Sequence, residues 1–297
     1  MKIELIGGIE GGGTKFVCGV ASRDGEIVEI IRFPTTRPKD TIEKVISFFK
    51  PYVEGGNLKK LGVGSFGPVD TDHESPAYGF ITATPKPGWS NTPILNILQQ
   101  ALGVKVYFDL DVNAAALGEY RWGSAKGCDP CLYLTIGTGI GGGYVQNGRP
   151  LKGLMTPEMG HILIPHDLKL DPFKGACPFH GDCFEGLANG PAILERLGQP
   201  GENLLDEHPF WEIEAGYIAL ALTNYILTLS PRKIILGGGI MQREFLFPLI
   251  RSKVQALLNG YVASSLVTEG MHDYILPPGL GDRAGLMGAV ALTLIDQ

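Results

Sequence analysis

Short apolar runs bounded by glycine-rich turns alternate along the chain with longer segments whose apolar side chains recur every three to four residues. The runs at 5–10, 15–22, 61–67, 105–111 and 233–239 have the length and the bounding turns of buried β-strands. The longer segments, at 41–53, 91–103, 112–122, 212–229, 242–259 and 284–296, predict helices. Strands that alternate with helices predict an α/β fold whose sheet is covered on both faces.

The helix expected at 91–103 has clear end signals. Asn91 or Thr92 can cap its first turn, Pro93 suits the first helical position, and Gly103 suits the end. The stretch from 151 to 210 is rich in loop-forming residues, and we expect little regular structure there.

The opening pattern returns near the middle of the chain. GIEGGGTKFVCGVASRDGEI (8–27) and CLYLTIGTGIGGGYVQNGRPL (131–151) each read as a strand, a glycine turn, a second strand and a further turn. The two segments match in pattern more than in residue identity, so the sequence suggests a duplication without proving one. Two such halves predict a bilobed protein that binds its ligand in the cleft between the lobes.

The two glycine turns predict phosphate binding. Glycine leaves backbone N–H groups uncovered, and a row of such groups forms an anion-binding nest. Each turn has a threonine beside it, Thr14 or Thr138. Neither is a P-loop, because Lys15 directly follows Thr14 and the required spacing is absent. LGGGIM (236–241) also lacks the G-x-G-x-x-G spacing of a dinucleotide fold.

The composition and charge of the chain argue against nucleic acids and membranes as partners. The chain has 297 residues, is 44% hydrophobic and carries a formal net charge of −6. It has no basic cluster, which argues against a nucleic-acid surface, and no apolar run long enough to span a bilayer. The N-terminus lacks signal-peptide features, and five cysteines is an odd number, so we expect a reduced, cytoplasmic protein.

ACPFHGDCFE (176–185) supplies three candidate zinc ligands, Cys177, His180 and Cys183, in Cys-x-x-His-x-x-Cys spacing. A closed structural zinc site needs a fourth ligand. Cys128 and Cys131 form another C-x-x-C, but it leads into an apolar strand without two further ligands, so we interpret it as coincidental.

Asp111 lies where a predicted strand ends and a helix begins, a usual place for a functional side chain. Such a carboxylate can accept a proton as general base, or it can simply cap the helix. Asp109 is the reserve candidate.

GIEGGGTKF, GSFGPVD, DVNAAALGE, TIGTGIGGG, PEMGH and CPFHGDCFEG together, in this order over essentially the whole chain, resemble the ROK family of sugar kinases and sugar-responsive repressors. ATPKPGW and EGLANGPAI resemble its bacterial fructokinase branch most. The resemblance implies a two-lobed actin-like, hexokinase-like (ribonuclease H-like) ATPase fold with an interdomain cleft. One lobe would comprise 1–118 and 283–297, the other 119–282.

The resemblance also implies roles for individual residues. Asp111 would be the catalytic base. Hexose hydroxyls would be bound by Asn113, Glu158, His161 and Glu185. ATP would be bound by Gly12, Gly13, Thr14, Lys15, Thr138, Gly139, Pro191, Gly238 and Gly239. Glu10 stands where many members have Asp near the nucleotide-bound Mg²⁺, and Leu110 stands where many have Asn, which removes a possible sugar contact.

His161 would be the fourth zinc ligand by the same resemblance, in a structural Cys₂His₂ site that fixes the loop 162–185. This loop is longer than in many members, so His166 is a rival fourth ligand. The implied activity is ATP- and Mg²⁺-dependent phosphorylation of a hexose, D-fructose first, with a homodimer as the expected assembly.

Three alternatives stay open. Glucokinase, mannokinase or N-acetylmannosamine kinase would keep the chemistry and change the sugar, and Thr84, Lys86 and Trp89 are candidates for that choice. A sugar-responsive repressor would need a helix-turn-helix domain before residue 7, where the sequence has no room for one. A non-catalytic sugar sensor is the remote alternative.

Overall fold

The computed structural model describes residues 4–295. By the contacts within each part, the chain forms two compact units. Unit 1 comprises 1–127, 148–156 and 279–297, and unit 2 comprises 128–147 and 157–278. Each unit contains strands and helices, so the predicted α/β class is confirmed. The division predicted from the sequence stays a prediction.

Unit 1 is built on a five-stranded sheet in the order β3-β2-β1-β4-β5. Its strands are β1 (Leu5–Gly11), β2 (Lys15–Ala21), β3 (Ile27–Pro34), β4 (Leu58–Ser65) and β5 (Lys105–Leu110). β1 and β2 form an antiparallel hairpin, and β2 pairs antiparallel with β3. β4 pairs parallel with β1 and with β5. The two-residue strand β8 (Arg149–Pro150) also belongs to this unit.

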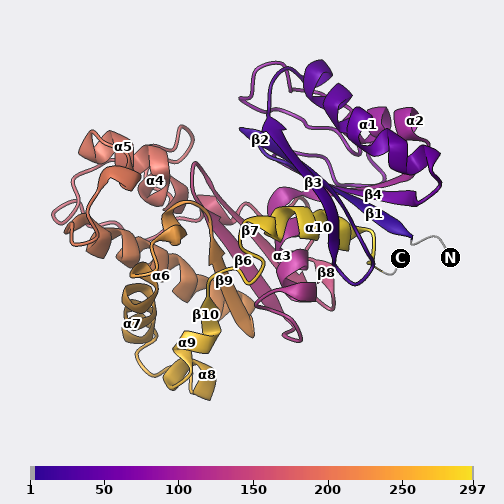
Figure 1. Ribbon diagram of the computed structural model, residues 1–297. Helices are drawn as coiled ribbons and strands as arrows, with labels where there is room; N and C mark the ends of the chain where they lie inside the picture. Colours follow the sequence, from indigo (N-terminus) through magenta and orange to yellow (C-terminus); the bar gives the residue numbers. More distant parts are fainter. Residues whose placement is uncertain (1–3, 296–297) are drawn as a thin grey trace. The chain divides into compact units, whose positions relative to one another are not determined.

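Helices cover both faces of this sheet (Figure 1). α1 (Pro38–Glu54) and α2 (Ile94–Leu102) pack on one face, and α3 (Asp111–Trp122) and α10 (Ala284–Leu292) pack on the other. Successive glycines of β1 show the alternation, because a Cβ at Gly7 would meet Phe49 of α1 and one at Gly8 would meet Leu286 of α10. Because these two glycines have no side chains, α1 and α10 can pack closely against the sheet.

Unit 2 contains a sheet in the order β10-β9-β6-β7. Its strands are β6 (Cys131–Ile136), β7 (Ile140–Gln146), β9 (Lys233–Gly237) and β10 (Ile275–Leu276). Its helices are α4 (Phe184–Ala188), α5 (Gly190–Leu197), α6 (Phe210–Leu229), α7 (Leu246–Leu258), α8 (Ser265–Thr268) and α9 (Met271–Tyr274). β6 and β7 form an antiparallel hairpin, and β6 runs parallel to β9. The hairpin expected at 131–151 is thus present.

Several predicted boundaries are wrong. β3 was missed, and the loop-rich stretch holds α4, α5 and two short 3-10 turns at Met159–His161 and Gly201–Asn203. The helix expected from 242 begins at Leu246, after a 3-10 turn at 240–242. The helix expected to 296 ends at Leu292, and residue 296 lies outside the described residues.

The helix at 91–103 also starts later than expected. Pro93 occupies the N-cap position, so neither Asn91 nor Thr92 caps it, and Asn91 instead takes a positive φ of 58° in the preceding turn. Gly103 ends the helix in the left-handed conformation, as predicted.

Within residues 4–295, every helix is too short or too polar to cross a bilayer.

Candidate active site and metal centre

The turn between β1 and β2 holds four of the residues expected to bind ATP. It is closed by the Gly12 N–H, which donates to the Lys15 carbonyl at 2.9 Å. Thr35 braces it from outside, since its N–H donates to the Thr14 carbonyl at 2.9 Å and its hydroxyl to the Gly12 carbonyl at 2.6 Å. Thr14 and Lys15 are exposed, and a Cβ added at Gly13 would meet nothing within 4 Å. The turn therefore presents open backbone to a ligand.

Glu10 lies in β1 just before this turn and is half-buried, with its Oε2 atom buried. Burial raises the pKa of its carboxyl, Lys15 and Arg32 lower that pKa, and Asp282 raises it again. Among the described residues, its Oε2 atom has no hydrogen-bond partner. Gly285 makes room for the carboxylate, because a Cβ there would lie 2.5 Å from the Glu10 Cδ atom. A buried carboxylate oxygen beside the turn between β1 and β2 is a suitable acceptor for a hydrated cation.

Asp111 is the first residue of α3, at the end of β5. Its Oδ1 atom accepts the Val112 N–H at 2.8 Å, and the residue is half-buried. Gly64 of β4 permits this position, because a Cβ there would lie 2.7 Å from the Ala114 Cβ and 3.4 Å from the Asp111 Cα. Asp111 thus lies on a rigid strand-to-helix junction.

Asp109 has a different environment. It is 3% exposed, and its Oδ1 atom accepts both the Leu110 N–H and the Asn113 side-chain amide at 2.8 Å. Its Oδ2 atom lies 3.5 Å from the Lys152 ammonium. Asn113 is 1% exposed, so the structure directs its amide toward Asp109. The Asp109 carboxylate is therefore held by these neighbours, and Asp109 does not replace Asp111 as candidate base.

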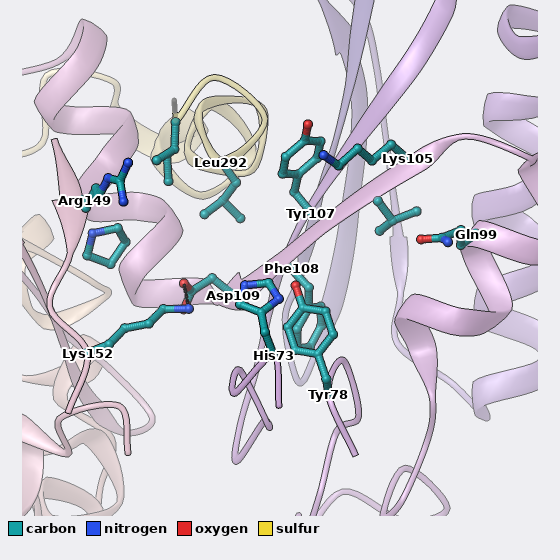
Figure 2. Close-up of a pocket in the computed structure, with 13 residues that line it drawn as sticks. His73, Tyr78, Gln99, Lys105, Tyr107, Phe108, Asp109, Arg149, Lys152 and Leu292 are labelled. Atoms are coloured by element: carbon teal, nitrogen blue, oxygen red, sulfur yellow. Dashed lines mark ion pairs between the residues drawn. The ribbon is translucent and has the colours of Figure 1, made fainter. Parts of the chain in front are cut away.

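A cavity of about 540 Å³ lies on the Asp109 side of β5 in unit 1 (Figure 2). Asp109 and Lys152 meet at its wall, beside His73 and Tyr78, and Arg149 and Leu292 line it further along. Asp111 is not among its lining residues. This cavity is separate from the candidate catalytic carboxylate.

The candidates for the choice of sugar are divided. Trp89 is 0% exposed, stacks on Phe16 at 5.5 Å between ring centroids, and donates its indole N–H to the Thr36 carbonyl. It is a core residue, so its suggested contact with sugar is wrong. Thr84 and Lys86 are half-buried in the same loop, where the Lys86 N–H donates to the Thr84 hydroxyl at 3.3 Å.

In unit 2 three glycine-containing segments meet at the ends of β6 and β9. The Gly190 N–H donates to the Gly137 carbonyl at 2.7 Å, which sets the start of α5 and the exposed Pro191 beside the 137–139 turn. Gly238 has a φ of +92°, and a Cβ there would lie 2.4 Å from the Ile136 carbonyl oxygen. Only glycine fits there. The segments thus bring together Thr138, Gly139, Pro191, Gly238 and Gly239.

The structure brings His161, Cys177, His180 and Cys183 together, with their ligand atoms all within 4.8 Å of one another. His161 Nδ1 lies 3.7 Å from Cys177 Sγ and 3.6 Å from Cys183 Sγ, and His180 Nδ1 lies 3.7 Å from Cys177 Sγ. Tetrahedral zinc with ordinary Zn–S and Zn–N bonds would separate such atoms by about 3.6 Å. The donor set and its spacing therefore fit a zinc ion.

His166, the rival ligand, is engaged elsewhere. Its Nδ1 atom lies 3.1 Å from an Asp182 carboxylate oxygen, and its Nε2 atom lies 3.0 Å from the Asp171 carbonyl oxygen. Both ring nitrogens thus have partners outside the Cys₂His₂ group. His166 braces the loop around that group.

Glu158 and Glu185 flank His161. The Glu185 Oε1 atom lies 3.8 Å from His161 Nε2, while its Oε2 atom accepts the Ile140 N–H at 2.8 Å. Glu158 is exposed, but the surrounding protein partly desolvates its carboxyl, and the pKa of that carboxyl is raised overall. The charge of Glu185 also raises this pKa, whereas His161 lowers it. His161 thus faces the thiols with one ring nitrogen and a carboxylate with the other. Two carboxylates and an imidazole edge can bind adjacent sugar hydroxyls.

No sequence motif predicts the buried ion pair that anchors this loop. Arg196 of α5 holds both carboxylate oxygens of Asp171, at 3.2 and 3.0 Å, and the two side chains are 7% and 4% exposed. Tyr217 donates to the same carboxylate at 2.6 Å, and the Arg196 guanidinium lies 4.3 Å from the Phe173 ring centroid. The partners are far apart in sequence and belong to no local motif, so no pattern could have paired them.

The chain matches the sequence model of the ROK family over residues 6–295. It is 41% identical to a fructokinase of Pediococcus pentosaceus, and the match covers 97% of each chain.

Two solved structures are similar. The ROK hexokinase of Thermus thermophilus is 28% identical and superposes with a TM-score of 0.79, covering 97% of both chains. A ROK family glucokinase of Streptomyces griseus, solved with glucose and AMPPNP, is 26% identical with a TM-score of 0.75, covering 97% of this chain and 98% of that one. These matches confirm the predicted hexokinase-like fold.

Proposed function

The chain belongs to the ROK family, and on that premise we propose that it is a fructokinase, transferring the γ-phosphoryl group of ATP to D-fructose to give D-fructose 6-phosphate. The observation that carries the choice of sugar is the 41% identity to a fructokinase over nearly the full length, against 26% to a glucokinase. Glucose, mannose and N-acetylmannosamine are the competing acceptors.

Asp111 is the general base in this proposal. The hexose hydroxyl attacks the γ-phosphorus, its proton passes to an Asp111 carboxylate oxygen, and the bond from the γ-phosphorus to the bridging oxygen breaks to release ADP. The strand-to-helix junction supports this role, since it fixes the backbone of Asp111 while leaving the residue half-buried. Asp109 is occupied by Leu110, Asn113 and Lys152.

The two glycine turns bind the nucleotide's phosphates. Open backbone at Gly13 and the exposed Thr14 and Lys15 supply N–H, hydroxyl and ammonium donors in unit 1. The segments around Thr138 and Gly238 supply the corresponding surface in unit 2. Mg²⁺ bound with the nucleotide neutralises charge on the phosphates. Glu10, with its unpartnered buried oxygen, would hold the water shell of that ion.

Zinc has a structural role in this proposal. His161, Cys177, His180 and Cys183 would fill all four tetrahedral positions, so no position is left for a reacting water. The metal would fix the ring of His161 and leave its Nε2 edge facing Glu185. Glu158, His161 and Glu185 then bind the sugar as one preorganised group.

Two further parts of the proposal rest on the family alone, a homodimeric assembly and a cytoplasmic location. Light scattering on the purified protein measures the mass of the assembly. A mass equal to one chain across the working concentration range contradicts the dimer.

Replacing Asp111 by Asn tests the mechanism. Without a base, kcat should fall by about 10²- to 10⁴-fold, whereas the dissociation constant for the sugar should change by no more than a few-fold, because the amide keeps the size of the side chain. Coupled ADP release and a direct sugar titration measure the two quantities. The matched control is Asp72→Asn, an exposed aspartate that should leave both unchanged. An Asp111→Asn protein with nearly full kcat would place the base elsewhere.

A further inference from the structure

The short helix α4 contacts the 137–140 turn through the side chain of Glu185. Glu185 Oε2 accepts the Ile140 N–H at 2.8 Å. The approach is close, because a Cβ added at Gly139 would lie 3.0 Å from that same oxygen. The carboxylate therefore fixes the side of the turn that leads into β7.

The chain just beyond α4 holds the other side of the turn. The Asn189 N–H donates to the Glu185 carbonyl at 3.2 Å and ends the helix, and the Gly190 N–H donates to the Gly137 carbonyl at 2.7 Å. The turn adds one bond of its own, from the Gly137 N–H to the Gly139 carbonyl at 3.0 Å. Glu185 of α4 thus holds the turn at Ile140, and Gly190, the first residue of α5, holds it at Gly137.

The beginning of α4 joins it to the metal-binding group. Cys183 is its N-cap, and the Cys183 carbonyl accepts the Leu187 N–H at 3.0 Å. Its thiol lies 3.6 Å from His161 Nδ1, while Glu185 Oε1 lies 3.8 Å from His161 Nε2. One helix therefore connects the Cys₂His₂ group to the turn expected to bind ATP.

We propose that Glu185 is a positioning residue for the nucleotide, and that its hydrogen bond to Ile140 keeps the 137–140 turn in the conformation that binds phosphate. The proposal rests on the ATP site proposed above and adds a second role to a residue expected to bind sugar. A carboxylate near a triphosphate would by itself repel it, so this support must come from the hydrogen bond and not from the charge. Nucleotide affinity should depend on Glu185 even in the absence of a hexose.

Two substitutions separate the hydrogen bond from the charge. Glu185→Ala removes both, whereas Glu185→Gln removes the charge and keeps a carbonyl that can accept the Ile140 N–H. Calorimetric titration with AMPPNP and Mg²⁺, without sugar, should show that the alanine variant binds about tenfold more weakly or worse. The glutamine variant should bind within about twofold of the unsubstituted protein, or more tightly. Glu195→Ala, an exposed glutamate of the neighbouring helix α5, is the control and should change nothing.

Hydrogen exchange at the Ile140 amide gives a readout independent of any ligand. Its protection should fall in Glu185→Ala and persist in Glu185→Gln. Equal AMPPNP affinity in the alanine and unsubstituted proteins would overturn the proposal, and so would a glutamine variant as weak as the alanine variant. If exchange behaves as expected but no protein binds AMPPNP, the proposed kinase function fails while the contact between Glu185 and the turn stands, and the nucleotide role fails with the function.

Discussion

Two aspartates of unit 1, Asp109 and Asp111, lie two residues apart, and their different surroundings suit them to different roles. The carboxylate of Asp109 is buried and is surrounded by two N–H donors and an ammonium group. Asp111 begins a helix and is half-buried. Because the Asp109 carboxylate is buried and held by its neighbours, it is a poor proton acceptor for a substrate, and the half-buried Asp111 is the candidate base.

The burial of a third carboxylate, that of Glu10, should make the stability of the protein depend on pH. Because burial raises its pKa, the folded protein binds a proton at Glu10 more tightly than the unfolded chain does. This contribution to stability is present below the ordinary pKa near 4.5 and is lost as the pH rises through the raised pKa. Lys15, Arg32 and Asp282 are the charged groups that act on it.

Glu10→Gln should therefore stabilise the nucleotide-free protein at neutral pH and have little effect at pH 4. We expect the melting temperature to rise by about 2–4 °C at pH 7, with the gain shrinking as the pH falls. Calorimetry in metal-free buffer across this range measures it. A gain that is largest at pH 4 would contradict the assigned direction of the pKa shift.

Single residues could be predicted from the sequence where the spacing is short. Cys177, His180 and Cys183 follow from a seven-residue motif, and the structure brings them together with His161. Asn113 shows the limit, because its amide contacts Asp109 four residues earlier in β5, and only the fold reveals that this buried carboxylate needs a donor.

At the scale of elements, the strands and helices with strong periodicity were predictable and the others were not. β3 was missed because it is an edge strand whose side chains, such as Glu29 and Arg32, alternate irregularly between solvent and sheet. α4 was missed because five residues are too short for a helical period. Its stability comes from the contacts at its two ends.

The loop from 162 to 183 is another element whose order comes from outside itself. Near its middle, Asp171 is held by Arg196 and Tyr217. Towards its end, the Cys177 and Gly181 backbones bond to each other, and the two cysteines approach His161. The contacts of Asp171 need no metal. The second group of contacts brings two buried cysteine thiols close to His161, an arrangement that a bound cation would stabilise.

Removing zinc should therefore loosen only part of the loop. Metal analysis should find about one zinc per chain. After chelation, amide exchange over 174–183 should quicken by tenfold or more, while Asp171 and its neighbours from 166 stay protected by the Arg196 pair. Unchanged exchange over 174–183 in verified metal-free protein would contradict a structural metal there, and so would purified protein that contains and binds no zinc.

At the scale of the whole molecule, the family could be predicted from the sequence because its motifs are spread over the entire chain in order. The match over residues 6–295 agrees with that reading. The choice of sugar has a weaker physical basis, since Trp89, one residue suggested for it, is part of the core. Selectivity between hexoses depends on contacts made around the substrate, and short motifs do not encode these.

The proposed activity is the transfer of phosphate from ATP to a hexose, with D-fructose preferred. The most direct test is the rate of ADP release with ATP and Mg²⁺, measured with fructose, glucose, mannose and N-acetylmannosamine in turn. We expect turnover that requires a hexose and a kcat/KM for fructose at least tenfold above that for each other sugar. A preference for another hexose would contradict the assigned substrate, and ADP release that no sugar stimulates would contradict the kinase itself.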